Sequence, residues 1–201
     1  MRRASLFLAF VLLGGGCGTQ RPKLVDTPPP TTTTFAGSRL TPPRPAPPLS
    51  LKDASGRRYT LNKRHGHFVL VTFLYTHCPD VCPLVASSLN TVLRTIGPKA
   101  GVEVAALSVD PKGDTARSVR AYAKRMHLLP TFHYLIGSRA ELEPAWAAWN
   151  VRAVSRKPNL VDHINYTALV DRRGRELLLY DAQVRAQDVL HDLRLLKKQG
   201  A

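Results

Sequence analysis

The sequence predicts an α/β domain in which a central mixed sheet is flanked by helices. Residues 67–75 are almost continuously β-branched, leucine or aromatic, which is typical of a strand buried on both faces. Apolar residues at helical spacing over 84–96 follow, and a second strand (102–109) and a second helix (115–126) repeat the alternation. Strand, helix, strand, helix indicates a parallel βαβ unit. Residues 165–180 then read as an antiparallel hairpin whose turn contains a glycine.

Four further elements complete the predicted domain. They are a short hairpin over 50–61 with its turn at Ser55-Gly56, a strand over 132–135, a helix over 140–149 with core residues Trp146 and Trp149, and a final helix over 186–198. A βαβ half followed by a ββα half, with paired cysteines after the first strand of the βαβ unit, is the thioredoxin arrangement. We therefore expect a thioredoxin-like fold with an N-terminal hairpin extension.

The first 17 residues resemble an export signal of a lipoprotein. Two arginines precede an apolar stretch, residues 4–13, that is too short to span a bilayer comfortably. Three glycines then lead to Cys17, as at a bacterial lipoprotein cleavage site whose cysteine becomes lipid-modified. Ordinary cleavage nearby and an uncleaved anchor are the alternatives. We expect the domain at the extracytoplasmic face of the bacterial cell membrane, anchored through Cys17, where thiols can be oxidised.

Residues 18–48 are predicted to be a linker. Proline and threonine dominate this stretch, which cannot build a hydrophobic core and favours extended, semi-rigid conformations. Its simplest use is to tether a folded domain, residues 49–201, to a membrane anchor.

The chain is strongly basic, with 29 Lys and Arg against 14 Asp and Glu and a formal net charge of +15. No dense basic run interleaved with aromatic residues is present, so no nucleic acid is expected as a partner. Attraction to anionic lipid headgroups or to an acidic protein fits an anchored domain better. A solvated basic surface without a specific partner explains the charge equally well.

Cys78 and Cys82 stand four residues apart directly after the first predicted strand of the βαβ unit. A structural disulfide between them would close too short a loop to constrain the unfolded chain much. A redox pair at a helix N-terminus would have a stabilised thiolate. However, thioredoxin-type enzymes separate their cysteines by two residues and place a cis-proline before the facing strand, whereas residues 161–166 contain no proline. A soft metal ion bound by both thiolates is the third interpretation.

His163 lies where the ββα half begins, a position that packs beside the cysteine-bearing helix end in this fold. Two thiolates and one imidazole suit Cu(I) and can also hold Cu(II), whereas zinc normally takes a fourth ligand. Asp162 could orient the imidazole or cap a turn. A lone histidine before a strand is usually a polar surface or capping residue, but the position of His163 relative to Cys78 and Cys82 favours copper as the bound metal.

Three motifs carry a specific family resemblance. They are Thr76-His77-Cys78-Pro79-Asp80-Val81-Cys82-Pro83, Ser108-Val109-Asp110-Pro111-Lys112-Gly113-Asp114-Thr115, and Asp162-His163 leading into Leu169-Val170-Asp171. In this order the motifs resemble the Sco/SenC family of copper chaperones for cytochrome c oxidase assembly, from about Leu49 to the C-terminus. The resemblance implies a thioredoxin-like fold and the same three copper ligands. It also implies delivery of copper toward the dinuclear site of the oxidase.

The leading hypothesis is a membrane-tethered metallochaperone and not an enzyme. Its expected partners are the copper-site subunit of cytochrome c oxidase or another copper chaperone, together with a thiol reductant. The rival is a thiol-disulfide reductase that uses Cys78 and Cys82 as its catalytic pair on the cysteines of a copper-site protein. A copper sensor remains open. A peroxidase would need a threonine four residues before its cysteine, and that position is Leu74.

Neighbouring polar residues receive simpler interpretations. His77 flanks the site, and Asp80 lies where a carboxylate favours the helix dipole. Asp110 and the pair Asp114-Thr115 most simply end a strand and cap the next helix, with a supporting role for Asp110 near the metal as the alternative.

Overall fold

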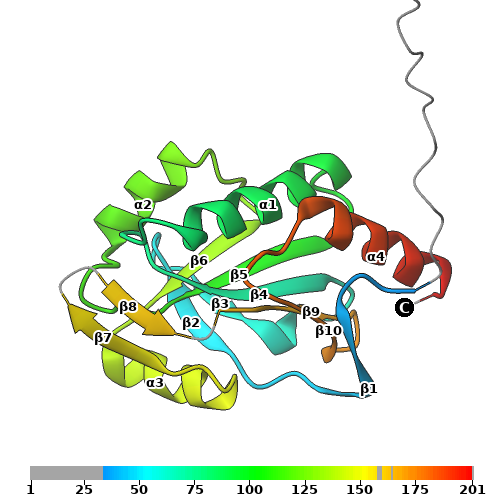
Figure 1. Ribbon diagram of the computed structural model, residues 1–201, viewed down its shortest axis with the longest axis horizontal. Coiled ribbons are helices and arrows are strands. Elements are labelled where there is room, and N and C mark those ends of the chain that lie inside the picture. Colours follow the sequence, from blue (N-terminus) through cyan, green and yellow to red (C-terminus); the bar gives the residue numbers. More distant parts are fainter. Residues whose placement is uncertain (1–33, 158–159, 164, 201) are drawn as a thin grey trace, which may run out of the picture. The chain divides into compact units, whose positions relative to one another are not determined.

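An eight-stranded mixed sheet forms the centre of the fold (Figure 1). The computed structural model describes residues 34–157, 160–163 and 165–200 of the 201, and no side chains between residues 154 and 164. The strand order is β1-β10-β9-β4-β5-β6-β2-β3. The strands are β1 (Ser38–Pro45), β2 (Ser50–Asp53), β3 (Arg58–Thr60), β4 (Phe68–Leu74), β5 (Val102–Ser108), β6 (Phe132–Ile136), β9 (Thr167–Val170) and β10 (Arg175–Tyr180).

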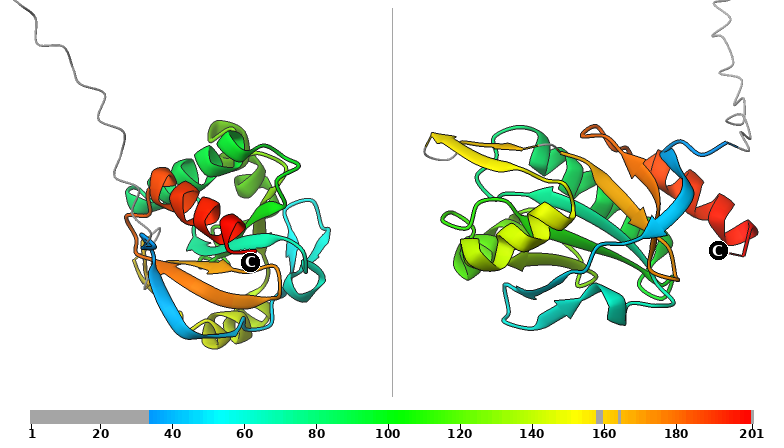
Figure 2. Two further views of the ribbon diagram at one scale, coloured as in Figure 1. Left: turned by 90° about the vertical axis from the view of Figure 1, so that its right-hand side faces the viewer. Right: turned by 90° about the horizontal axis from the view of Figure 1, so that it is seen from below.

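Helices cover both faces of the sheet. They are α1 (Val81–Ile96), α2 (Ala116–Arg125), α3 (Arg139–Ala148) and α4 (Ala186–Lys198), with a 3-10 turn, η1, at Leu61–Lys63. Figures 1 and 2 show α1, α2 and α4 on one face and α3 on the other. Among the described helices, none combines the length and the apolar character needed to cross a bilayer.

The core is built around β4 and β5, in which every side chain is buried. The two strands pair in parallel from Phe68 opposite Val102 to Leu74 opposite Ser108. Burial of each large apolar side chain stabilises the fold by about 1.5–3 kcal/mol. Because both faces of these strands are covered, their sequences are continuously apolar, and this pattern is what made them predictable.

The predicted fold class is confirmed. The βαβ unit, the β2–β3 hairpin and the β9–β10 hairpin all form, and the remaining predicted helices and strands begin and end within a few residues of their expected bounds. Trp146 and Trp149 are 4% and 1% exposed, as expected of core residues.

Strand β1 was not predicted, because it lies inside the Pro/Thr-rich stretch expected to be linker up to residue 48. It pairs with β10, from Ser38 opposite Leu179 to Pro45 opposite Arg175. An edge strand tolerates proline because one side of it needs no ladder hydrogen bonds. The sheet therefore begins at Ser38. The predicted signal at residues 1–17, with Cys17, lies outside the described residues.

A buried carboxylate on α4 holds the chain that leads into β1. Asp192, which is fully buried, accepts hydrogen bonds from the backbone N–H groups of Ala36 and Gly37, both at 2.9 Å, and from the Tyr180 hydroxyl. A side chain at Gly37 would place its Cβ 2.8 Å from the Tyr180 ring, so only glycine fits there. These bonds fix the described start of the chain against α4.

A separate two-stranded ribbon, β7 (Ala153–Lys157) and β8 (Leu160–His163), connects α3 to β9. It is antiparallel, and His163 at the end of β8 pairs with Ala153. The sequence predicted neither strand. The backbone of His163 is therefore held in a ribbon outside the main sheet.

Candidate metal centre

The two thiols lie in the connection that follows the carboxyl end of β4 and enters α1. Cys78 stands two residues before the N-cap residue Asp80, and Cys82 lies in the first turn of the helix. Both cysteines are free thiols, with Cys78 8% exposed and Cys82 fully buried. The backbone N–H of Cys82 donates to Cys78 Sγ at 3.4 Å. The predicted placement of a cysteine pair at a strand-to-helix junction is confirmed.

The two thiols have opposite protonation tendencies. A hydrogen bond from the Cys82 thiol lowers the pKa of Cys78 to about 5, against the effect of burial, and the Asp80 and Cys82 backbones and Tyr75 add further hydrogen bonds. The same hydrogen bond, together with burial, raises the pKa of Cys82 far above its ordinary value. Of the two sulfurs, Cys78 is therefore the one that ionises first, with the Cys82 thiol as its hydrogen-bond donor.

Asp114 organises the end of β5 behind the thiols. Its carboxylate accepts hydrogen bonds from the Thr76 backbone N–H (2.8 Å) and hydroxyl (2.7 Å), from the Ser108 hydroxyl (2.7 Å) and from the Tyr134 hydroxyl (3.1 Å). The residue is only 3% exposed. Burial raises the pKa of Asp114, while these hydrogen bonds oppose the rise. Asp114 thus ties the cysteine connection, β5 and β6 together.

The expectation that Asp114 merely ends a strand and helps cap a helix is therefore too simple. Capping of α2 is done by Thr115, whose hydroxyl accepts from the Ser118 backbone N–H, as the sequence predicted for the pair. In the sequence, a residue that caps a helix and a residue that hydrogen-bonds to distant segments look alike, since each is a short polar residue before a helix. Only the tertiary contacts of Asp114 reveal its second role.

Aromatic residues close the space beside the thiols. The Tyr122 hydroxyl donates to the Cys82 carbonyl at 3.4 Å, and the Tyr122 and Tyr134 rings meet edge to face, 5.8 Å apart. Burial raises the pKa of both hydroxyls, so they remain protonated donors. On the α3 side of the sheet, away from α1, the Trp146 indole donates to the Ser108 carbonyl at the end of β5 at 2.9 Å. The Tyr122 hydrogen bond thus holds the backbone at Cys82, and burial leaves both thiols little contact with water.

His77 and Asp110 approach one another at Gly113. A side chain at Gly113 would collide with Asp110 Oδ2, and its Cβ would lie 3.1 Å from His77 Nδ1. The Asp110 carboxylate accepts from the Gly113 backbone N–H at 3.0 Å, which closes a turn. His77 Nδ1 lies 3.2 Å from the Thr76 hydroxyl and its side chain is exposed. Both residues flank the thiols, as predicted for His77.

The third predicted ligand, His163, is located only by its backbone, at the end of β8. Its side chain and that of Asp162 lie outside the described residues. Among the residues with described side chains, no group of three His, Cys, Asp or Glu could hold a metal ion. The set Cys78, Cys82 and His163 therefore stays a prediction.

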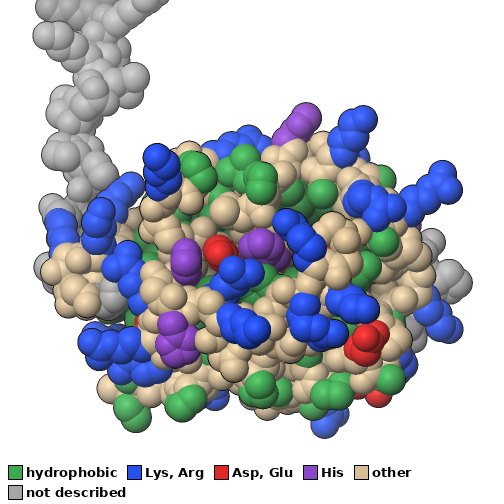
Figure 3. Space-filling view, turned by 180° about the vertical axis from the view of Figure 1, so that it is seen from behind, with side chains coloured by type: hydrophobic (Ala, Val, Ile, Leu, Met, Phe, Trp, Pro, Cys, Tyr) green, Lys and Arg blue, Asp and Glu red, His purple; other side chains and the backbone are tan. Residues whose placement is uncertain are grey.

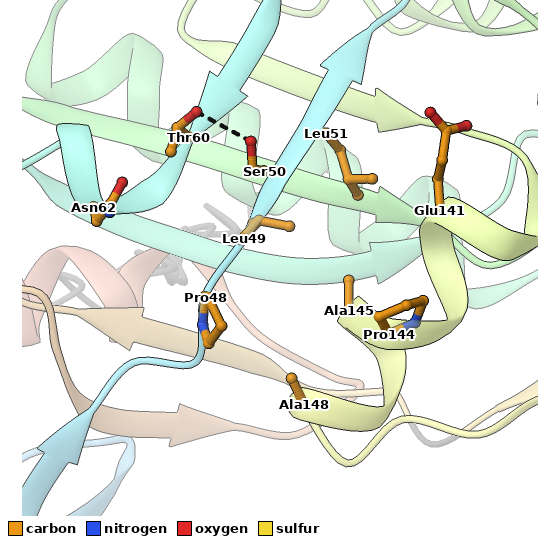
Figure 4. Close-up of a pocket in the computed structure, with 10 residues that line it drawn as sticks. All are labelled: Pro48, Leu49, Ser50, Leu51, Thr60, Asn62, Glu141, Pro144, Ala145 and Ala148. Carbon is orange, nitrogen blue, oxygen red and sulfur yellow. Dashed lines mark hydrogen bonds between the residues drawn. The ribbon is translucent and has the colours of Figure 1, made fainter.

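A pocket of about 270 Å³ between β2 and α3 is not a rival centre (Figure 4). Its lining is Pro48, Leu49, Ser50, Leu51, Thr60, Asn62, Glu141, Pro144, Ala145 and Ala148. It contains one carboxylate and neither a thiol nor an imidazole. The pocket therefore offers no soft ligand for a metal.

Comparison with known sequences identifies the family. A family model described as SCO1/SenC matches residues 39–198, which is most of the chain. The chain belongs to the SCO1/SenC family. The match begins at β1, ten residues before the boundary expected from the resemblance.

Individual Sco proteins agree with this assignment. An SCO2-like protein of Rickettsia prowazekii is 27% identical over 150 residues, covering 71% of this chain and 72% of that protein. The solution structure of apo Sco1 from Thermus thermophilus has a TM-score of 0.69 and 35% identity, covering 81% of this chain and 97% of that one. Arabidopsis thaliana ScoI, solved with copper bound, has a TM-score of 0.67 and 26% identity, covering 75% and 97%. The thioredoxin-like Sco fold is thus shared.

The pH dependence of the alkylation rate measures the pKa of the reactive thiol in this Sco protein. In the reduced, metal-free protein we expect the rate of Cys78 modification by iodoacetamide to rise with pH with a midpoint near 5, because the thiolate is the nucleophile. Cys82→Ala removes the main hydrogen-bond donor, so the midpoint should move upward. Peptide mapping by mass spectrometry separates the cysteines. Ser87→Ala on the exposed side of α1 is the control, and a midpoint near 9 in the unaltered protein would contradict this account.

Asp114→Ala should destabilise the Sco domain by about 2–5 kcal/mol, because it leaves buried hydroxyl and N–H donors without an acceptor. Urea unfolding followed by circular dichroism measures the change. Asp181→Ala removes an exposed carboxylate that accepts from the Gln183 backbone N–H, and should cost less than about 1 kcal/mol. Equal losses in the two variants would show that Asp114 does not organise the site.

Proposed function

We propose that this chain is a membrane-tethered, extracytoplasmic copper chaperone. It binds copper through Cys78, Cys82 and His163 and delivers it to the copper site of cytochrome c oxidase or to another chaperone. The observation that carries the proposal is the pair of free thiols after β4, in which hydrogen bonds lower the pKa of Cys78.

The ionised sulfur is suited to capture copper. Thiolate is the soft ligand that Cu(I) prefers, and Cys78 has this form above a pH of about 5. Cys78 is also the more accessible sulfur, since Cys82 is fully buried. Copper therefore meets Cys78 first, and its positive charge then favours loss of the proton from Cys82. Binding should release that proton to solvent.

The proposed site can hold copper and still release it to a partner protein. Two sulfurs and one imidazole leave copper with few ligands, so an incoming ligand from a partner can add before a bound one leaves. The connection that carries Cys78 is anchored through Thr76 to Asp114, whereas its outer surface, at Pro79 and Asp80, is exposed. An anchored connection with an exposed outer surface suits transfer of copper by ligand exchange with a partner protein.

Family membership supports the direction of delivery. The Sco family is a family of cytochrome c oxidase assembly proteins. The copper-bound Arabidopsis relative supports copper as the cargo. For this chain the tether would be the N-terminal segment with lipid on Cys17, and a thiol reductant would keep Cys78 and Cys82 competent to bind.

Anaerobic titration of the reduced protein with Cu(I) and with Cu(II) tests the ligand set. We expect one copper ion per chain in the unaltered protein and at least about tenfold weaker binding by His163→Ala, because one of three ligands is lost. His65→Ala, which changes an exposed histidine at the opposite end of β4, should bind like the unaltered protein. Absorption spectra and competition with a chelator give the affinities.

Unchanged binding by His163→Ala would contradict the proposal. So would rapid reduction of a protein disulfide without copper that needs both cysteines and not His163. That result would instead identify a thiol-disulfide reductase.

A further inference from the structure

The charged residues of helix α2 are all cations. The helix contains Arg117, Arg120, Lys124 and Arg125, each of them exposed, and no Asp or Glu. Lys112, which is also exposed, stands shortly before the helix. Figure 3 shows Lys and Arg side chains gathered on the side of the molecule where α2 lies, with few acidic side chains among them. These five residues are called the α2 cations below.

The α2 cations lie beside the cysteine connection. In the middle of α2, the Tyr122 hydroxyl donates to the Cys82 carbonyl at 3.4 Å. Before the helix begins, a Cβ at Gly113 would lie 3.1 Å from the Nδ1 atom of His77, the residue that precedes Cys78. Helix α2 therefore runs alongside the connection, and its positive charge is close to the proposed copper site.

The charge of the α2 cations is not neutralised by neighbouring carboxylates. None of the five forms an ion pair with another side chain that the structure describes. Arg120 donates to the Ala54 carbonyl at 2.8 Å, and Arg125 lies over the Tyr122 ring, 5.2 Å from its centre. Both contacts orient a guanidinium and leave its charge in place. Asp114, the acid nearest to α2 in the sequence, is 3% exposed and already accepts four hydrogen bonds.

The outer surface of the cysteine connection is apolar. Pro79 and Leu84 are exposed, and Val81 and Pro83 between them are half-buried. Of the large apolar side chains that the structure describes, Leu84 alone is exposed, at 65%. A single exposed leucine is ordinary on a protein surface, but Leu84 stands with two prolines and a valine in the segment that carries the thiols. The Cys78 sulfur is thus bordered by an apolar surface and by the α2 cations.

Transfer of copper requires a partner to cover this surface. Cys78 is only 8% exposed, so a ligand atom of the partner reaches copper on this sulfur only if the two proteins meet around the connection. Asp80 is the exposed carboxylate of the connection, and the five α2 cations outweigh it. Protein interfaces combine an apolar centre with a polar rim, and opposite charges across the rim speed association. A partner with exposed carboxylates therefore fits this surface.

We propose that the connection from Pro79 to Leu84 and the α2 cations form one docking surface for an acidic protein that carries copper ligands. Carboxylates of the partner face the α2 cations, and an apolar side chain of the partner packs on Leu84. Thiol, thioether or imidazole groups of the partner then reach the copper. A lipid headgroup has no such soft ligand, which favours a protein as the occupant. This inference deepens the proposed function and rests on it.

Disulfide exchange with two synthetic peptides tests the docking on the full, reduced, metal-free chain. Both peptides carry a leucine and a cysteine in disulfide linkage to 2-thiopyridine, and they differ only in having glutamates or glutamines at their other positions. The Cys78 thiolate attacks the peptide sulfur, a new disulfide joins Cys78 to the peptide, and thiopyridone leaves. The absorbance of thiopyridone gives the rate, and a Cys78→Ser variant gives the background from other thiols.

We expect the acidic peptide to react about tenfold faster than the neutral one at low ionic strength, because complementary charge speeds the encounter. In 1 M salt, where the Debye length falls to about 3 Å, the two rates should converge. The double variant Arg117→Gln, Lys124→Gln should remove most of the preference. Leu84→Ala should slow both peptides alike, because it removes the apolar contact that they share.

The matched control is Arg194→Gln with Lys197→Gln, which removes the same charge from α4. Both residues line a pocket with Phe68 at the amino end of β4, away from the thiols, so this variant should keep the preference. Equal rates for the two peptides, or a preference that both double variants reduce to the same extent, would overturn the docking surface. Equal rates together with protection of α2 from hydrogen exchange by phosphatidylglycerol vesicles would overturn it in favour of a lipid.

Copper titration of the unaltered protein judges the proposed function separately. If the chain takes up no copper while the acidic peptide keeps its preference, the copper chaperone is wrong and the surface serves an acidic thiol partner. If copper is bound and the preference is absent, the chaperone stands and the docking surface is wrong.

Discussion

The buried carboxylate of Asp114 is the constraint on which the site depends. It joins three segments that are distant in sequence, because its partners are Thr76 beside the cysteines, Ser108 at the end of β5 and Tyr134 in β6. Burial of a carboxylate is costly unless its hydrogen bonds are satisfied, and here four donors satisfy it. The connection with Cys78 is therefore fixed from behind, and its geometry follows from the packing of the sheet.

This fixed geometry divides the two sulfurs into different chemical roles. Cys82 is enclosed beneath Tyr122 and keeps its proton, which it donates to Cys78. Cys78 has a lowered pKa and is slightly exposed, so it is the sulfur better suited to act as a ligand or a nucleophile. The same arrangement can form a disulfide, so oxidation removes both sulfurs from copper at once. The redox state of the pair thus gates the proposed binding.

Much of the fold could be predicted from the sequence, because strands buried on both faces, such as β4 and β5, have continuous apolar patterns. Strand β1 could not, since its proline-rich composition is typical of linkers and its order comes from pairing with β10 and from Asp192. The ribbon β7–β8 has no apolar alternation strong enough to reveal it. For the site, the cysteines were predictable from their spacing, whereas Asp114 needed tertiary contacts, and His163 remains a prediction.

The thiols follow the carboxyl end of β4, at one end of the sheet. The central claim is that copper at the thiol end is held by two sulfurs and one imidazole. X-ray absorption spectroscopy of the copper-loaded, reduced protein measures this directly. The account predicts two sulfur neighbours and one imidazole nitrogen, with the imidazole signal lost in His163→Ala. A copper ion with sulfur ligands alone, or an imidazole signal that persists in that variant, would contradict it.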